Sequence, residues 1–298
     1  MPELAPIVIF PYKRLFHLQQ TIEALKSNTL ASESHVYIYS DGAKTKEDEE
    51  AVKAVRQYLK GVTGFKKIQV CEREKNFGLS QSIMHGVGEI INKYGKVIVL
   101  EDDIVTSKYF LKFINDGLHY YENEEKVGFV SGYVYPVKGK LPDSFFLQGT
   151  DTWGWGTWKR SWDLYHSDGK KIMADLKKEK LIDKMNFNGA YPYSEMMEDQ
   201  LKKETPAWDI IIYAQAILYN KLTLFPGKSL VQNIGHDNSG THCKETTIFH
   251  VDLYDQPITM EKIEVKESKK AHRLFEDFYR RNFNPTLLHR IKRRLKID

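Results

Sequence analysis

Three acidic residues follow one another at the end of an apolar run, and three adjacent carboxylates are candidates for binding a cation. The run covers residues 96–100, and Glu101, Asp102 and Asp103 follow it. Adjacent carboxylates at a buried strand end repel one another and lose hydration, so they need a cation. Mg²⁺ and Mn²⁺ prefer oxygen ligands and are often shared with phosphate groups. The alternative is a solvated turn, because Asp is common in the loop after a strand.

The local conformation limits how this acidic triplet can share an ion. Neighbouring side chains of a strand point to opposite faces of the sheet. If residues 101–103 continue the strand, their carboxylates cannot all bind one ion. We therefore expect the three residues to have different roles.

Strand and helix signals alternate along the first half of the chain. We expect strands at 7–10, 35–40, 68–70 and 96–100 and helices at 15–25, 46–59 and 79–94. This alternation predicts an α/β fold with a mainly parallel sheet flanked by helices. Ligands of such sheets bind beyond the carboxyl ends of the strands. Polar residues follow three of these strand ends, namely Lys13 with Arg14, Asp41, and the acidic triplet.

The loops at the other strand ends suit an anionic ligand. Arg14 or Lys13 could pair with a phosphate, or form an exposed basic turn. Asn76 and Gly78 precede a helix whose N-terminal amides suit a diphosphate or ribose hydroxyls, although Ser80 could be an ordinary cap. The chain has neither a Gly-x-Gly-x-x-Gly segment after its first strand nor a Walker loop. Dinucleotide oxidoreduction and P-loop chemistry therefore lack their usual signals.

The amino-acid composition is typical of a folded protein with a small net charge. The chain has 298 residues, a formal net charge of +4 and two cysteines. This charge does not predict a nucleic-acid partner. The few cysteines favour a reducing compartment. The N-terminus has no basic segment followed by a long apolar run, and no stretch approaches a membrane span, so we expect a cytoplasmic protein.

The order of these motifs resembles the GT-A glycosyltransferases. Val-Leu-Glu-Asp-Asp is similar to the inverting branch that includes N-acetylglucosaminyltransferases, and to bacterial sugar transferases of surface polysaccharide synthesis. This resemblance implies that Asp103 ligates Mn²⁺ or Mg²⁺ and that Glu101 and Asp102 lie near the ribose and the diphosphate. It implies that Asp41 accepts a hydrogen bond from a uracil base, although Asp-Gly is also a common turn. Arg14, with Asn76 and Gly78 of an Asn-x-Gly-Leu segment, would complete the donor site, and Arg73 or Lys75 could reach the nucleotide.

The second half begins with a segment rich in tryptophan and glycine. Aromatic faces stack on sugar rings, and glycine lets a backbone approach a ligand closely. We expect Trp153 and Trp155, which are flanked by glycines, to bind the acceptor, and we expect Trp158 and Trp162 to fill the core. The Gly-Trp-Gly-Thr-Trp segment also resembles the bacterial sugar transferases. A charged, weakly ordered stretch is expected at 166–203, then a helix at 208–219 and strands at 223–225 and 229–232.

An inverting transfer needs a carboxylate that takes the proton of the acceptor hydroxyl. Trp208 and Asp209 resemble the start of a Trp-Asp-Asp-Trp segment in which an Asp is the base, although Ile210 and Ile211 replace the rest. We expect Asp209 to be the catalytic base, with an acid stabilised at a helix N-terminus as the alternative. Glu198 and Asp199 are the reserve candidates.

Residues 233–242 form a polar loop that could close over the diphosphate. Its two histidines, His236 and His242, are candidates for the metal or for phosphate, and we expect His242 to be a metal ligand. A single structurally bonded histidine is the alternative. The spacing does not resemble a zinc site.

We expect one domain at 1–265, with a nucleotide-sugar half at 1–134 and an acceptor half at 135–265, and a basic helical tail at 266–298. A basic and partly apolar helix can lie on an anionic membrane, which would suit a lipid-linked acceptor at the inner face of the plasma membrane. A solvated or disordered tail is the alternative.

The sequence thus predicts a metal-dependent inverting glycosyltransferase. It would move a sugar from a nucleotide-sugar donor, UDP-linked and with N-acetylglucosamine as the candidate sugar, to a glycan or a lipid-linked saccharide. Surface polysaccharide or lipopolysaccharide synthesis would be its setting. The alternatives are a nucleotidyltransferase and a nucleotide-sugar-binding protein without turnover.

Overall fold

The computed structural model describes residues 3–165, 168–203, 206–239 and 246–283. An eight-stranded sheet has the order β3-β2-β1-β4-β8-β6-β9-β7, and β10 pairs with β5 in a small second sheet. The strands are β1 (Ile7–Phe10), β2 (His35–Ser40), β3 (Lys67–Glu72), β4 (Lys96–Glu101), β5 (Ile104–Thr106), β6 (Val127–Ser131), β7 (Ser144–Gln148), β8 (Trp155–Trp158), β9 (Leu222–Pro226) and β10 (Val231–Asn233). The helices are α1 (Leu15–Lys26), α2 (Glu49–Leu59), α3 (Leu79–Tyr94), α4 (Phe110–Tyr120), α5 (Lys159–Trp162), α6 (Gly169–Lys178), α7 (Ile182–Met185), α8 (Tyr193–Gln200), α9 (Trp208–Leu218) and α10 (Lys269–Phe283), with 3-10 turns at Ala31–Glu33 and Lys46–Asp48.

The large sheet is mainly parallel, which confirms the predicted fold class. β3, β2, β1 and β4 pair in parallel, and β6 pairs in parallel with β9. β8 and β7 run antiparallel to their neighbours. Every residue of β1 is buried, as expected for a parallel strand that is covered on both faces, whereas the edge strand β3 is largely exposed. The carboxyl ends of β1, β2 and β4 therefore meet at one edge of the sheet.

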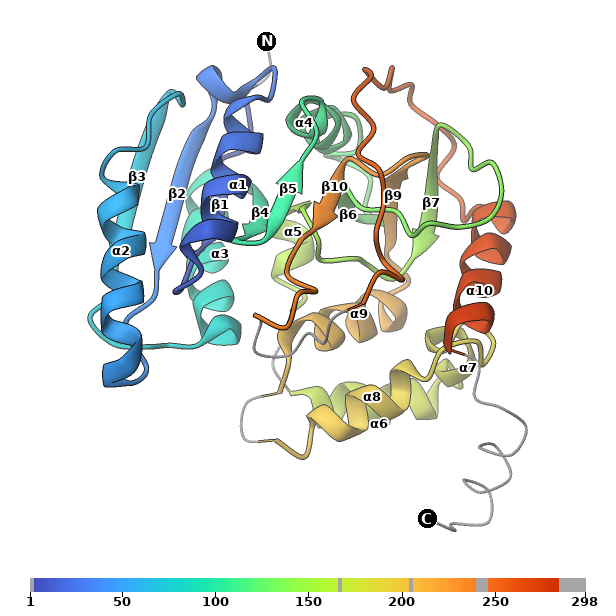
Figure 1. The fold of residues 1–298 in the computed structure, drawn as a ribbon. Coiled ribbons are helices and arrows are strands. Elements are labelled where there is room, and N and C mark those ends of the chain that lie inside the picture. Colours follow the sequence, from blue (N-terminus) through green and yellow to red (C-terminus); the bar gives the residue numbers. More distant parts are fainter. Residues whose placement is uncertain (1–2, 166–167, 204–205, 240–245, 284–298) are drawn as a thin grey trace.

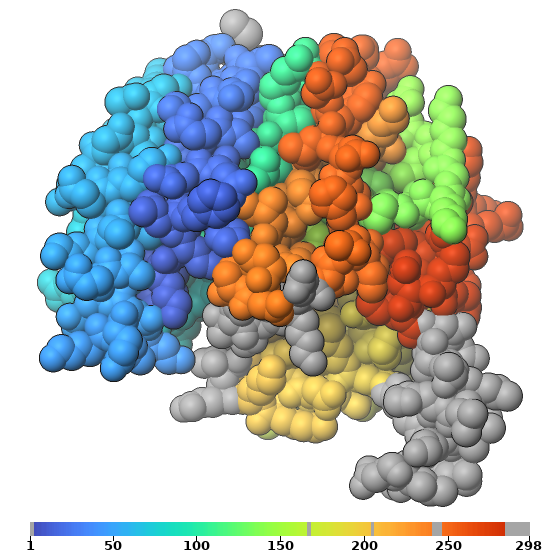
Figure 2. All heavy atoms as spheres, in the orientation of Figure 1, coloured from blue at the N-terminus to red at the C-terminus, as the bar shows by residue number. Residues whose placement is uncertain are grey.

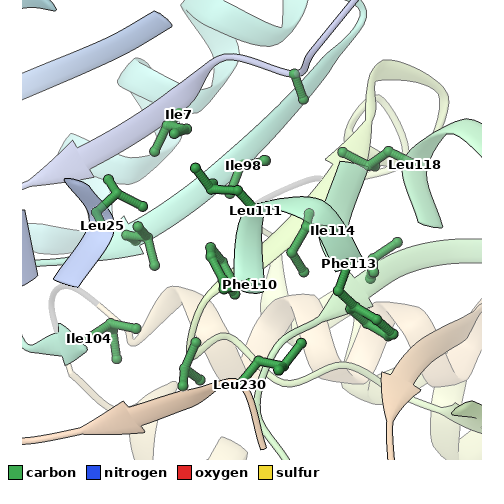
Figure 3. Packing of buried hydrophobic residues seen from close by; sticks show 14 of the residues in the cluster. Ile7, Leu25, Ile98, Ile104, Phe110, Leu111, Phe113, Ile114, Leu118 and Leu230 are labelled. Carbon is green, nitrogen blue, oxygen red and sulfur yellow. The ribbon is translucent and has the colours of Figure 1, made fainter. Parts of the chain in front are cut away.

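Alternate residues of the central strands face two different helical layers. Ile7 and Ile9 join a core cluster with Leu18 of α1, whereas Val8 and Phe10 join a second cluster with helix α3. Figure 1 shows α1 and α2 on one side of the sheet and α3 on the other. Figure 3 shows the first of these clusters, in which α4 packs beside the sheet residues. Burial on both faces fixes the strand register, because a slip of one residue would exchange the faces.

Weak order was predicted for residues 166–203, but the structure has three helices within the part of this stretch that it describes, residues 168–203. α6 buries Ile172, Met173 and Leu176 on one face, which is helical spacing, and the side chain of Asp168 accepts a hydrogen bond from the Lys171 amide at its start. α7 and α8 follow it. The prediction was wrong because the many lysines of this stretch line the outer faces of short amphipathic helices.

α10 belongs to the folded unit and not to a separate tail that begins at residue 266. Ala271, Phe275, Phe278 and Tyr279 are buried in the core cluster of the second half. Figure 1 shows α10 beside β7. Residues 284–298, the last part of the predicted tail, lie outside the described residues. No helix in the described ranges is long and apolar enough to cross a membrane.

The packing of α10 predicts a large loss of stability when its central aromatic ring is removed. Phe275→Ala should lower the free energy of unfolding by about 3–5 kcal/mol, because it leaves a cavity in the second core. Arg273→Ala on the exposed face of α10 is the matched control and should change it by less than about 0.5 kcal/mol. Chemical denaturation measures both. Equal stabilities for the two variants would contradict the placement of α10 in the core.

Candidate functional site

The acidic triplet forms a turn between two strands. β4 ends at Glu101, Asp102 and Asp103 form the turn, and β5 begins at Ile104. Asp102 is 4% exposed and Asp103 is 6% exposed. We expected a continuing strand to point neighbouring carboxylates to opposite faces, but the turn directs Asp102 and Asp103 to one shared partner. That partner is Arg14.

Arg14 lies in the loop between β1 and α1 and binds both carboxylates. Its Nη2 atom donates to Asp102 Oδ1 and, at 2.7 Å, to Asp103 Oδ2. Burial lowers the pKa of Arg14, but the two negative charges outweigh burial and raise it. The attraction between Arg14 and the two carboxylates offsets part of the desolvation free energy of burying two adjacent acids.

Arg14 does not fully compensate the acidic triplet for its burial. Burial raises the pKa of Asp102 to about 6, although Arg14 acts in the opposite direction. Burial, followed by the charges of Asp103 and Asp209, raises the pKa of Glu101 well above its ordinary value. One guanidinium therefore does not neutralise three carboxylates, and the turn favours additional positive charge.

A segment from the second half of the chain closes one side of the turn. The Ile234 amide donates to the Asp103 carbonyl oxygen at 2.9 Å. A Cβ atom on Gly235 would lie 2.1 Å from Asp103 Oδ2, so only glycine fits against this carboxylate. His17 Nε2 lies 3.0 Å from Asp237 Oδ2, which ties the same segment to α1. In Figure 2 the orange surface of this segment adjoins the blue surface of the N-terminal residues.

The donor set of the turn fits a hard divalent cation. Asp103 Oδ1 is buried and has no hydrogen-bond partner within the part of the chain that the structure describes. A carboxylate oxygen is a ligand that Mg²⁺ and Mn²⁺ accept, and these ions usually take their remaining ligands from water and phosphate. The described residues contain no group of three or more His, Cys, Asp or Glu side chains that could hold a metal on its own. An ion at this turn would therefore take its remaining ligands from water or from a bound anion.

Asp41 lies at the same edge of the sheet, but its carboxylate is already used by the backbone. Its Oδ1 accepts from the Phe77 amide at 2.9 Å and its Oδ2 accepts from the Gly78 amide at 2.8 Å. Asn76 donates to the Gly42 carbonyl oxygen at 2.8 Å. Asp41, Asn76 and Gly78, which were predicted to bind the donor, thus come together and hold the loop before α3. Their contact with a nucleotide stays a prediction.

Arg73 is the basic residue of this region that reaches the interior. It is 7% exposed, its guanidinium lies 4.3 Å from the centre of the Phe77 ring, and it donates to Ser82. Lys75 is exposed. Phe77 keeps 41% of its surface exposed beside this buried cation. An aromatic face backed by a guanidinium is a suitable surface for a flat nucleobase.

The two candidate tryptophans have different surroundings. Trp155 is 1% exposed and stacks on Trp208 at 5.8 Å between ring centres, so it fills the core and offers no free face to a sugar ring. Trp153 is partly buried and packs against Tyr133 and His236. The buried positions of Trp158 and Trp162 agree with their predicted place in the core. Sequence could not separate these tryptophans because the strand over residues 155–158 was not predicted.

Asp209 lies near the triplet. It is exposed in the first turn of α9, and Asp209 Oδ1 accepts from the Ile210 amide at 2.8 Å. Its charge contributes to the raised pKa values of Glu101 and Asp151, so these three carboxylates belong to one region.

The other candidates for base and metal ligand are placed elsewhere or not described. The reserve residues Glu198 and Asp199 pair with Lys177 and Lys202 on the outer surface of α8. His236 lies 5.2 Å from Trp153 between ring centres. His242 lies outside the described residues.

Asp151 is a functional candidate that the sequence did not single out. Its Oδ1 accepts from the Trp153 amide at 2.9 Å and its Oδ2 accepts from the Tyr135 hydroxyl at 3.4 Å. Burial, and then the charge of Asp209, raise its pKa to about 7. A carboxyl group of this pKa can exchange a proton near neutral pH. The only sequence signal was an acid directly before the tryptophan-rich segment.

Comparisons with known proteins give structural matches but no family. No family model and no curated protein match the chain. A crystal structure of S. aureus TarS matches with 15% identity and a TM-score of 0.41, over 76% of this chain and 36% of TarS. The S. aureus TarS 1-349 structure matches with 14% identity and a TM-score of 0.40, over 76% of this chain and 59% of that chain. Mannosyltransferase PcManGT from Pyrobaculum calidifontis, in complex with GDP-Man and Mn²⁺, matches with 10% identity and a TM-score of 0.37, over 72% of this chain and 69% of that chain.

The environment of Asp151 predicts a pH dependence of stability. Its pKa is about 7 in the folded state, against an ordinary value of 3.8, so the folded state binds more protons in that interval. The folded protein should therefore lose stability as the pH rises, by about 2–3 kcal/mol from this group between pH 5 and pH 8. Asp151→Asn should reduce that loss, as measured by urea unfolding at several pH values. Asp199→Asn on the surface is the control, and identical pH slopes for wild type and Asp151→Asn would contradict the assignment.

Proposed function

We propose that this protein is a metal-dependent inverting glycosyltransferase that transfers a sugar from a nucleotide-sugar donor to an acceptor hydroxyl. The observation that carries the proposal is the buried acidic turn at the carboxyl end of β4. It combines an unpartnered buried oxygen of Asp103 with a cation, Arg14, at the edge where parallel sheets bind their ligands.

Asp103 and Asp102 would hold the divalent cation, because they present oxygen ligands at one turn. When bound, the cation supplies positive charge that stabilises the leaving diphosphate. The chain's own groups would bind the rest of the donor. Arg14 lies beside the same carboxylates and can form a bidentate pair with a phosphate.

The nucleoside would lie over the loop that Asp41 holds before α3. Phe77 offers an exposed ring there, and Arg73 supports it from beneath. The loop is fixed through the two backbone amides that donate to Asp41, so its shape is set before a ligand arrives. A preformed loop binds a ligand without losing further conformational entropy. UDP is the proposed nucleotide because the Val-Leu-Glu-Asp-Asp segment resembles the N-acetylglucosaminyltransferases, whereas the Asp41 carboxylate is occupied by backbone amides.

Asp209 would be the general base. It would remove the proton of the acceptor hydroxyl while the hydroxyl oxygen forms a bond to the anomeric carbon. The bond between that carbon and the diphosphate oxygen breaks on the opposite face, which inverts the configuration. Its position in the first turn of α9, in the same region as Glu101, supports this role. Asp151 lies in the same region and is the second candidate for the base.

The acceptor would bind beside Trp153 and the segment that carries His236. We propose a glycan or a lipid-linked saccharide of surface polysaccharide synthesis as acceptor and N-acetylglucosamine as the transferred sugar, with the protein at the cytoplasmic face of the membrane. These finer assignments follow from the sequence resemblance. A nucleotidyltransferase and a binding protein without turnover are the competing functions.

Calorimetric titration with UDP, GDP and CMP should detect binding of one nucleotide, expected to be UDP, that requires Mn²⁺. Asp103→Ala should weaken this binding at least tenfold, because it removes the unpartnered buried oxygen. Asp199→Ala, an exposed acid on α8, should bind like wild type. Absence of binding for all three nucleotides with Mn²⁺ would contradict a donor site at the turn.

Replacement of the base should affect turnover and leave donor binding intact. Asp209→Asn should lower kcat about 10²–10⁴-fold with little change in the affinity for the nucleotide. Transfer is measured as release of UDP from UDP-N-acetylglucosamine in the presence of a saccharide acceptor. Unchanged kcat in Asp209→Asn combined with a large loss in Asp151→Asn would assign the base to Asp151. Donor binding without turnover for any acceptor would favour the binding-protein alternative.

A further inference from the structure

Arg14 binds one oxygen of each of the two carboxylates that a divalent cation at the turn would approach. Its Nη2 donates to Asp102 Oδ1 and to Asp103 Oδ2, the latter at 2.7 Å. The Gly235 backbone packs against Asp103 Oδ2 from another direction. Asp103 Oδ1 is therefore the oxygen of this carboxylate that a new ligand finds without a hydrogen-bond partner in the described ranges.

Arg14 and a divalent cation compete at this position. A cation on Asp103 would stand next to a guanidinium that binds the same carboxylate, at a place where both acids are almost fully buried. Like charges repel strongly where water is largely excluded. The second oxygen of Asp103 cannot turn toward the cation without displacing either Arg14 or the Gly235 segment.

The Arg14 guanidinium is accessible to a phosphate ligand from the solvent. Its side chain is 19% exposed, whereas those of Asp102 and Asp103 are 6% and 8% exposed, so the guanidinium forms the solvent side of the cluster. A guanidinium binds phosphate as well as carboxylate through the same planar set of donors. A diphosphate held by the cation would place phosphate oxygens beside the turn that Arg14 leaves.

We propose that Arg14 is an internal counter-ion that holds the position of the divalent cation in the free protein and transfers to the diphosphate when cation and donor bind. This inference rests on the proposed function of the same site. It makes Arg14 a positioning residue that couples the two ligands. Because such coupling is reciprocal, UDP should raise the affinity for Mn²⁺ by the factor by which Mn²⁺ raises the affinity for UDP.

The test is the affinity for Mn²⁺ alone, measured by electron paramagnetic resonance without nucleotide. Arg14→Met, which keeps a long side chain and loses the charge, should bind Mn²⁺ at least tenfold more tightly than wild type. Lys13→Met removes the same charge from the same loop, but Lys13 pairs with Asp48 at 2.7 Å and not with the triplet, so its affinity should stay within about threefold of wild type. Added UDP should tighten Mn²⁺ binding at least tenfold in wild type and less in Arg14→Met.

Equal or weaker Mn²⁺ binding by folded Arg14→Met would overturn the inference. If the uncompensated acids prevent this variant from folding, Arg14→Met combined with Asp102→Asn keeps the net charge of the cluster and should still bind Mn²⁺ more tightly than Asp102→Asn alone. The wild-type measurement also stands by itself, because an affinity for Mn²⁺ that UDP leaves unchanged would refute the coupling. Wild type that binds Mn²⁺ with UDP while Arg14→Met shows no gain would overturn this inference only. Failure of every protein to bind UDP or Mn²⁺ would overturn the proposed function as well.

Discussion

The ion pair between Arg14 and the adjacent carboxylates Asp102 and Asp103 is the interaction on which the candidate site depends. Two neighbouring acids are almost fully buried at the end of β4, which is costly without a cation. Arg14 reaches them from the loop after β1, and Gly235 packs against them from the segment after β10. Three segments that are distant in sequence therefore meet at one turn. The loop after β1 and the turn after β4 must lie side by side, because β1 and β4 are neighbouring parallel strands.

Carboxylates serve two different purposes at this edge of the sheet. Asp41 is fully engaged by the Phe77 and Gly78 amides and fixes the loop before α3. Asp103 keeps one buried oxygen without a hydrogen-bond partner among the described residues, so it retains capacity for a ligand. Asp41 fixes the conformation of the loop at this edge of the sheet, whereas Asp102 and Asp103 place negative charge there. A phosphate-bearing ligand at this turn would need extra positive charge beside it, which is the chemistry that the proposed function requires.

Sequence predicted the first half of the fold well because its signals are local. The strand over residues 35–40 and the helix over residues 79–94 have the predicted bounds, since an apolar run and a helical spacing are each visible within one segment. The second half was harder. α6 and α8 are rich in charge and are stabilised by contacts with a distant core, and the strand over residues 155–158 was not predicted, which left the burial of Trp155 unforeseen. Sequence singled out Asp102, Asp103 and Arg14 as candidates, but their pairing depends on a turn at residues 102–103 that the strand pattern did not reveal. Asp151 was missed because its raised pKa arises from burial in the folded state.

We propose that the turn after β4 binds a divalent cation together with a nucleoside diphosphate. A crystal structure of the protein grown with UDP and Mn²⁺, with anomalous scattering measured at the manganese edge, would locate both ligands. We expect one manganese peak within about 2.0–2.4 Å of an Asp103 carboxylate oxygen and of a phosphate oxygen, with the uracil near Phe77. Manganese or UDP bound elsewhere on the molecule, with the ion pair between Arg14 and Asp103 intact and no peak at the turn, would contradict it.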